Sequence, residues 1–326
     1  MNKKLLALAL AALLALSMAA CGGSSTTEPA EEETVDEEGF KIGVVQLVEH
    51  VALDAATQGF KDAVEERLSN VEITVNLAQG EANNCATIVN NFVSSEVDLI
   101  MANATPALQA AVAGTDTIPI LGTSITEYGT ALELKDFNGI CGGNVSGTSD
   151  LAPLDQQAAM VKELFPDAKT VGLLYCSAEA NSQYQVDVVS EELENLGYEA
   201  RSYAFADSND IAAVVNGACS ECDVLYIPTD NTAASNTGII DQIALEAGVP
   251  IVASEEGICS GCGVATLSIS YYDIGYQTGV MAAEILAEGA DISTMPIAYA
   301  PKATKKYDAE RCEALGIEIP EGYEAI

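Results

Sequence analysis

The sequence predicts an α/β protein made of two similar lobes, each a parallel sheet wrapped by helices. Three observations support this prediction. Strand-like apolar runs alternate with helix-like periodic runs, the whole pattern recurs after about 130 residues, and small polar side chains follow the strands. Alternation of this kind is typical of parallel sheets with helical crossovers. A repeat of a whole β-α-β-α-β unit indicates two lobes that share one topology.

The chain opens with the pattern of a secretory signal peptide, residues 1–20. Lys3 and Lys4 precede an apolar run that is too short to span a membrane, and small residues come just before Cys21. The stretch Ser17-Met18-Ala19-Ala20-Cys21 resembles the lipobox of bacterial lipoproteins, so we expect Cys21 to carry lipid. The alternative is an ordinary secreted protein. Residues 21–40 are rich in Ser, Thr and Glu, and such a segment predicts a flexible acidic tether.

The first folded element is a short apolar run at 41–46, which predicts a buried parallel strand. A helix at 52–68 follows, because its apolar residues recur at spacings of three and four. Further strands are expected at 71–77, 97–102 and 118–122, and a second helix around 85–93. The apolar residues of the first helix are Leu53, Ala56, Phe60, Val64 and Leu68.

The repeat places the second lobe. Residues 42–45 match 171–174, the stretch 88–100 matches 214–225, and 118–120 matches 249–251. We therefore expect a first lobe of 41–148 plus about 271–295, and a second lobe of 149–270 plus about 296–326. The glycine-rich segment 139–147 is the predicted crossing, since glycine relaxes the limits on backbone rotation at a hinge.

Composition excludes some partners. The formal net charge is −36 at pH 7, so the surface repels nucleic acid and disfavours a highly anionic ligand. A zwitterion or a cation is easier to bind. The pairs Cys219/Cys222 and Cys259/Cys262 are interpreted as small packed side chains, with a disulfide or thiol chemistry as the less favoured alternatives.

Ligands of parallel α/β sheets bind beyond the carboxyl ends of the strands. The repeat identifies six such loops, and we expect them to line one hinged cleft. Hydroxyl and amide groups near helix N-termini suit a carboxylate, whereas acidic side chains suit an ammonium group. Helix capping is the alternative role for each residue. The candidate ligand-binding residues are Gln46, His50, Thr105, Thr123, Ser124, Ser177, Asn181, Asp230, Asn231 and Glu255.

Signals of catalysis are weak. His50 is the single histidine, and no nucleophile-elbow pattern surrounds a serine. The sequence shows no metal-binding cluster, phosphate-binding loop or dinucleotide fingerprint. We therefore expect a protein that is not an enzyme and needs no cofactor or metal.

Several specific stretches, in this order, resemble the TrpX-like family of ABC-transporter substrate-binding proteins. They include the opening at 41–60, Ala104-Thr105-Pro106-Ala107, and the stretches 143–150, 177–182, 228–232, 271–279 and 314–320. The resemblance spans the whole folded region. The loop at 123–128 and the loop at 259–262 depart from what the family leads us to expect there.

The resemblance implies a type I periplasmic-binding-protein fold with two Rossmann-like lobes. It implies a lipid-anchored monomer outside the cytoplasm that passes a solute to an ABC permease and ATPase. The implied solute is an amino acid, aromatic before branched aliphatic. The resemblance implies that the loops holding Thr105, Ser124, Ser177, Asn181 and Asp230 grip its main-chain groups, with Asp230 pairing with the ammonium. Tyr128, Tyr271 or a Phe is available for stacking. A ligand-sensing receptor lipoprotein and a binder of another solute, such as a nucleoside, are the alternatives.

Overall fold

The structure is a computed structural model that describes residues 39–326. The predicted signal peptide, Cys21 and nearly all of the predicted tether lie outside the described residues. Within them, no helix is long and apolar enough to cross a bilayer. All eight cysteines of this part are free thiols, and no group of acidic, histidine or cysteine side chains there could hold a metal ion.

The first lobe is built on a sheet with the strand order β11-β5-β4-β3-β1-β2, and every neighbouring pair in it is parallel. Its strands are β1 (Phe40–Gln46), β2 (Val71–Leu77), β3 (Leu99–Asn103), β4 (Ile120–Ile125), β5 (Val145–Ser149) and β11 (Ala298–Tyr299). Its helices are α1 (Val51–Arg67), α2 (Ala82–Ser94), α3 (Thr105–Gly114), α4 (Tyr128–Ala131), α11 (Tyr271–Glu288) and the short 3-10 helix η2 (Ile292–Thr294). The strands and helices expected between 41 and 125 are therefore confirmed, within a few residues at their ends.

The second lobe has the strand order β13-β12-β10-β9-β8-β6-β7, in which only the β10–β12 pair is antiparallel. Its strands are β6 (Thr170–Cys176), β7 (Glu199–Phe205), β8 (Val224–Ile227), β9 (Ile251–Ala253), β10 (Ala265–Ser268), β12 (Thr304–Tyr307) and β13 (Glu324–Ala325). Its helices are α5 (Leu154–Leu164), α6 (Ala180–Asn195), α7 (Ile211–Glu221), α8 (Asn231–Ala234), α9 (Thr237–Ala247), α10 (Glu256–Cys262) and α12 (Ala309–Leu315).

The internal repeat extends to hydrogen bonds. Asp98, just before β3, accepts the backbone N–H of Lys41 at 2.7 Å. Asp223, just before β8, accepts that of Lys169 at 2.8 Å. Both aspartates thus tie the start of the third strand of their lobe to the start of its first strand. These matched bonds explain why an aspartate recurs at this position.

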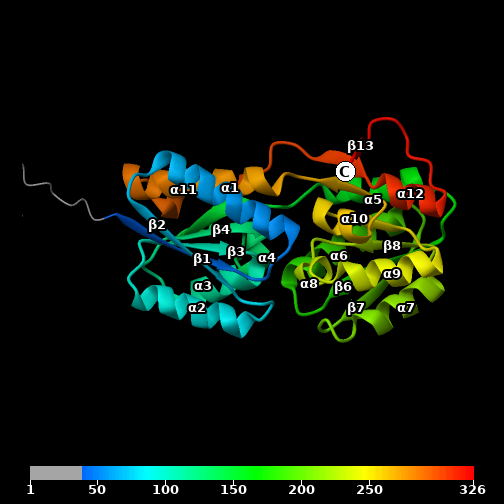
Figure 1. Cartoon of the computed structure of the whole chain (residues 1–326), viewed down its shortest axis with the longest axis horizontal. Coiled ribbons are helices and arrows are strands. Elements are labelled where there is room, and N and C mark those ends of the chain that lie inside the picture. Colours follow the sequence, from blue (N-terminus) through cyan, green and yellow to red (C-terminus); the bar gives the residue numbers. More distant parts are fainter. Residues whose placement is uncertain (1–38) are drawn as a thin grey trace, which may run out of the picture. The chain divides into compact units, whose positions relative to one another are not determined.

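Helices α1 and α11 pack closely on one face of the first sheet, with α2 and α3 on the other face (Figure 1). Small residues permit this approach. A side chain at Gly275 would overlap the carbonyl oxygen of Ala56, and one at Gly59 would overlap that of Tyr272. The core beneath the pair includes Phe60, which is fully buried. This packing fixes the N-terminal ends of both helices, and both reach the site described below.

The chain passes between the lobes at 150–153, 269–270 and 300–303. The prediction that the glycine-rich segment 139–147 forms the crossing was wrong. That segment leads into β5, which pairs with β4 inside the first sheet. Gly139, Gly142 and Gly143 have positive φ angles, so they serve tight turns before the strand and not an inter-lobe hinge.

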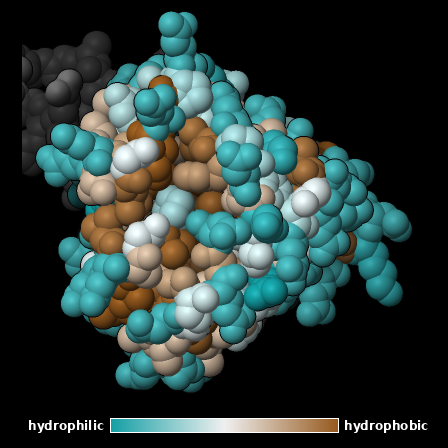
Figure 2. All heavy atoms as spheres, turned by 90° about the vertical axis from the view of Figure 1, so that its right-hand side faces the viewer, coloured by the Kyte–Doolittle hydropathy of each residue, from teal (hydrophilic) through white to brown (hydrophobic). Residues whose placement is uncertain are grey.

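The face of the second lobe shown in Figure 2 is mostly hydrophilic, with apolar side chains gathered to one side. This surface agrees with the acidic composition.

Candidate functional site

A small, tightly lined cavity lies where the two lobes meet, at the carboxyl ends of the strands. Its lining comes from both lobes and from the crossings between them. The lining residues are His50, Ala52, Leu53, Ser124, Thr126, Asp150, Asn181, Thr229, Asp230, Asn231, Ala234, Glu255, Ile258 and Tyr271.

The first lobe contributes two hydroxyl groups from the end of β4. The register of β4 against β5 shifts between Gly122 and Ile125, and Ser124 has a φ of 56°. This irregular turn brings both Ser124 and Thr126 to the cavity. Their hydroxyl oxygens are buried and have no hydrogen-bond partner in the protein. Buried hydroxyls without partners are rare in folded proteins, so a ligand is expected to bond them.

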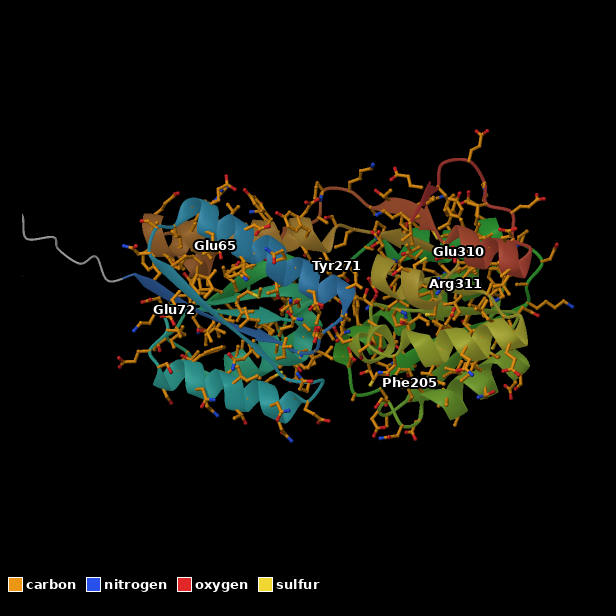
Figure 3. The ribbon with its side chains drawn as sticks, in the orientation of Figure 1. Glu65, Glu72, Phe205, Tyr271, Glu310 and Arg311 are labelled. Atoms are coloured by element: carbon orange, nitrogen blue, oxygen red, sulfur yellow. The ribbon has the colours of Figure 1, made fainter. Side chains whose placement is uncertain are left out.

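The first crossing contributes Asp150, which is 3% exposed. Its Oδ2 accepts a hydrogen bond of 2.9 Å from the hydroxyl of Tyr271, at the second crossing. Its Oδ1 has no partner. Burial raises the pKa of the Asp150 carboxyl to about 6, and the hydrogen bond from the Tyr271 hydroxyl opposes this rise. Figure 3 labels Tyr271 at the start of α11. The unpaired Oδ1 can accept a hydrogen bond from a donor on a ligand.

The N-terminus of α1 also reaches the cavity. Ala52 and Leu53 line it, and His50, at the cap position, makes no capping bond with its side chain. The first N–H groups of a helix have no partner inside the helix and carry a partial positive charge. Because α1 has 17 residues, this end offers a developed positive dipole to a carboxylate.

His50 joins the lobes. Its Nε2 lies 3.3 Å from Oδ1 of Asn231 in the second lobe, and its Nδ1 is buried without a partner. Burial lowers the pKa of the imidazole, and the hydrogen bond to Asn231 Oδ1 and the charge of Glu179 oppose that change. A neutral ring that donates from Nε2 presents Nδ1 as an acceptor.

The second lobe adds a network around Glu179. Its carboxylate accepts the backbone N–H of Asn231 at 3.0 Å and that of Thr232 at 2.9 Å. It also accepts the Asn231 amide at 2.6 Å. This carboxylate therefore holds the start of α8 and aims Asn231 across the cleft at His50.

Asp230 and Glu255 act as helix caps. Asp230 accepts the backbone N–H of Ala233 at 2.8 Å and that of Cys176 at 2.6 Å, so both of its oxygens are engaged. Glu255 accepts two N–H groups at the start of α10. Burial raises the pKa of both, that of Glu255 to about 7, with the charge of Glu179 adding to the rise at Asp230. Asp150 thus offers a freer oxygen to an ammonium than Asp230 does.

Six of the ten predicted residues line the cavity: His50, Ser124, Asn181, Asp230, Asn231 and Glu255. The other four lie outside its lining. Gln46 bonds Thr57 and Asp54, and Thr123 bonds Thr148. Thr105 is buried at the start of α3, and Ser177 bonds the Phe205 carbonyl oxygen. Whether any of the ten contacts the ligand stays a prediction.

Sequence reasoning missed Asp150, Thr126 and Thr229. Asp150 follows β5, so the rule that ligands bind at strand ends would have found it, had the crossing not been placed at 139–147. Thr126 and Thr229 stand one or two residues from predicted candidates. Tyr128, considered for stacking, is instead fully buried in the first lobe and donates to the carbonyl oxygen of Thr148.

A cavity between two α/β lobes, lined by polar atoms without partners, is typical of a two-lobed solute-binding protein. The chain belongs to the ABC transporter substrate binding protein family, whose model matches residues 41–324. Its resemblance to the TrpX-like members and the type I periplasmic-binding-protein fold are both confirmed. Proteins of this kind bind solutes and are not enzymes.

Three relatives are informative. The tyrosine-binding protein of Clostridioides difficile is 36% identical, over 91% of this chain and 87% of the relative. A Streptococcus pneumoniae ABC domain in complex with L-Trp is 31% identical, with a TM-score of 0.84 over 89% of this chain and 100% of that one. The ligand-free, open form of a substrate-binding protein with adhesive properties from Clostridium difficile is 36% identical, with a TM-score of 0.67 over 88% of this chain and 99% of that one.

The two structural comparisons bear on the state of the cleft. This chain superposes better on the L-Trp complex than on the open form, although its sequence identity to the open form is higher. The contact between His50 and Asn231 joins the lobes across the cavity. In this structure the lobes are therefore closed on the site.

Proposed function

We propose that this protein captures an aromatic L-amino acid outside the cytoplasm and delivers it to an ABC importer. One observation carries the proposal. Five buried polar atoms in the cavity wall have no partner: His50 Nδ1, Ser124 Oγ, Thr126 Oγ1, Asp150 Oδ1 and Asn181 Oδ1. Polar atoms left unpaired in a closed cavity cost free energy unless a ligand pairs them.

Charge supports an ammonium group on the ligand. Three buried carboxyl groups line the cavity, on Asp150, Asp230 and Glu255, and the lining includes no Lys or Arg. An ammonium beside Oδ1 of Asp150 would form a charge-assisted hydrogen bond. It would also favour the ionised form of a carboxyl whose pKa burial has raised.

The carboxylate end of an amino acid has a matching subsite. The hydroxyls of Ser124 and Thr126 are free to donate, and the uncapped start of α1 lies in the same wall. Neutral donors and a helix dipole hold a carboxylate without a counter-ion. The side chain would then lie among Leu53, Ile258 and the ring of Tyr271. The relatives named for tyrosine and L-Trp support an aromatic side chain.

The importer role and the location rest on other features. Membership of the family supports work with a permease and an ATPase. The lipobox-like Ser17–Cys21 supports attachment to the outer face of the cell membrane through Cys21, with the acidic segment after it as a tether. Metabolic labelling with a palmitate analogue tests this: the parent chain should become labelled and Cys21→Ala should not.

Ligand identity is tested by thermal shift on residues 39–326, which belong to a single compact unit. The protein is unfolded and refolded first to remove any ligand retained from the cell. Amino acids, nucleosides, sugars and short peptides are then screened. A ligand at about 100 times its Kd stabilises by roughly 2.7 kcal/mol, which is a shift of several degrees. A shift with aromatic amino acids supports the proposal, and a shift with another class alone refutes it.

A further inference from the structure

The Asn181 side chain presents a fixed hydrogen-bond acceptor to the cavity. It lies in the first turn of α6 and is 5% exposed. Its Nδ2 donates to the carbonyl oxygen of Thr229 at 2.9 Å, and lies 3.3 Å from both a Glu179 carboxylate oxygen and the Ser182 hydroxyl. Rotating the amide by 180° would set its oxygen against the Thr229 carbonyl and the Glu179 carboxylate. The surroundings therefore fix the orientation, with Oδ1 left over.

Asn181 Oδ1 is buried in the cavity wall without a partner. An amide oxygen can only accept a hydrogen bond, so a ligand that pairs with Asn181 Oδ1 must do so through a donor. Two ends of the ligand could supply one: the ammonium or the side chain.

The position of Asn181 favours the side chain. The free oxygen of Asp150 lies at the first crossing between the lobes, and the carboxylate subsite belongs to the first lobe. Asn181 belongs to the second lobe, as do the apolar Ala234 and Ile258 in the same cavity. A ligand held by its main-chain groups at the crossing and the first lobe extends its side chain towards these residues.

We infer that Asn181 is a specificity-determining residue that accepts a hydrogen bond from a donor on the aromatic side chain, a phenol O–H or an indole N–H. This inference rests on the proposed function and narrows its ligand class. Tyrosine and tryptophan satisfy the acceptor, whereas phenylalanine and leucine leave it buried and unpaired. Sites built to bond a side-chain donor discriminate strongly against analogues that lack it.

The test is isothermal titration calorimetry on refolded residues 39–326 with four ligands. L-Tyr is compared with L-Phe, and L-Trp with β-(3-benzothienyl)-L-alanine, in which sulfur replaces the indole N–H with little change in shape. We expect L-Tyr and L-Trp each to bind at least tenfold more tightly than the matched analogue. Matched affinities within threefold in both pairs would overturn the inference and leave the aromatic amino-acid function standing.

Asn181→Leu supplies the second measurement. Its preference for L-Tyr over L-Phe should fall to within threefold, while its affinity for L-Phe stays within threefold of the parent. Asn216→Leu, on the exposed side of α7, is the matched control and should keep the preference. A uniform loss for all four ligands would assign Asn181 to the ammonium and overturn the inference. If the parent binds none of them, the proposed function fails and the inference fails with it.

Discussion

Replacing Asp150 with asparagine should have opposite effects on ligand affinity and on the stability of the free protein. The change keeps the shape and removes the charge that we assign to the ammonium. Losing one partner of a buried charged pair costs about 2–4 kcal/mol, which corresponds to a roughly 30- to 700-fold rise in Kd. Calorimetry at pH 8 measures this. Asp155→Asn, on the exposed side of α5, is the control and should bind like the parent.

The free protein should become more stable. Burial raises the pKa of Asp150 from 3.8 to about 6. The folded state therefore holds its proton in a range where the unfolded state has lost it, and the free energy of unfolding falls as pH rises through that range. The difference of about 2.2 units corresponds to roughly 3 kcal/mol above pH 6. Asparagine escapes this cost, so Asp150→Asn should gain up to about 3 kcal/mol at pH 8 and almost nothing at pH 4.

Ligand affinity of the parent should follow the same titration. The ammonium needs ionised Asp150, so the ratio of the parent's Kd to the variant's Kd should rise about tenfold per pH unit as pH falls below about 6. Between pH 6 and pH 8 this ratio should stay constant. Glu255 titrates in both proteins, and because the charge of Asp150 adds to the rise of its pKa, the Glu255 pKa should be lower in the variant. A variant that binds within threefold of the parent at pH 8, or shares its pH profile, would refute the assignment of the ammonium to Asp150.

Further predictions concern packing, the second lobe and ligand chemistry. Gly275→Ala should lower the free energy of unfolding, measured in urea, by about 1–3 kcal/mol, because the added methyl group would overlap the carbonyl oxygen of Ala56. The control is Gly217→Ala, which has open space around it and should be neutral or stabilising. Arg311→Met should lower the free energy of unfolding by about 2–4 kcal/mol, because the guanidinium bonds Asp241 and three carbonyl oxygens at the end of α10. Breaking a fully buried charged pair typically costs about 3–5 kcal/mol. A loss below about 0.5 kcal/mol would contradict the prediction. N-acetyl-tyrosine and 4-hydroxyphenylpyruvate lack the ammonium and should give no thermal shift, and a shift as large as that of tyrosine would count against an ammonium subsite.

The sequence was sufficient for the fold because its signals are local or repeated. Apolar runs such as 41–46 and 171–176 mark buried parallel strands, and the matched Asp98 and Asp223 show that two units share one topology. The strand-end rule also found Asn181 and Glu255. These residues precede or begin helices, and a polar side chain between a strand and a helix is visible in the sequence pattern.

The rest depends on contacts between distant segments. Arg311 holds the end of α10 through carbonyl oxygens at 259–261, and backbone acceptors leave no trace in a side-chain pattern. Figure 3 shows Arg311 in the second lobe among the elements it joins. Similarly, the bond between Asp150 and Tyr271 joins residues 121 positions apart. The sequence suggested Tyr271 only for stacking, and the role of Asp150 becomes visible only when the two crossings are brought together.

The packing of α1 against α11 affects the order in which the lobes fold. The first lobe starts the folded chain, but its core is closed by α11 and its sheet is finished by β11, both made after most of the second lobe. During synthesis, therefore, the segment up to β5 emerges with its α1 face uncovered. Uncovered apolar surface promotes aggregation. The lobe that is made first is completed last, and a fragment ending near residue 150 should need a chaperone to remain soluble.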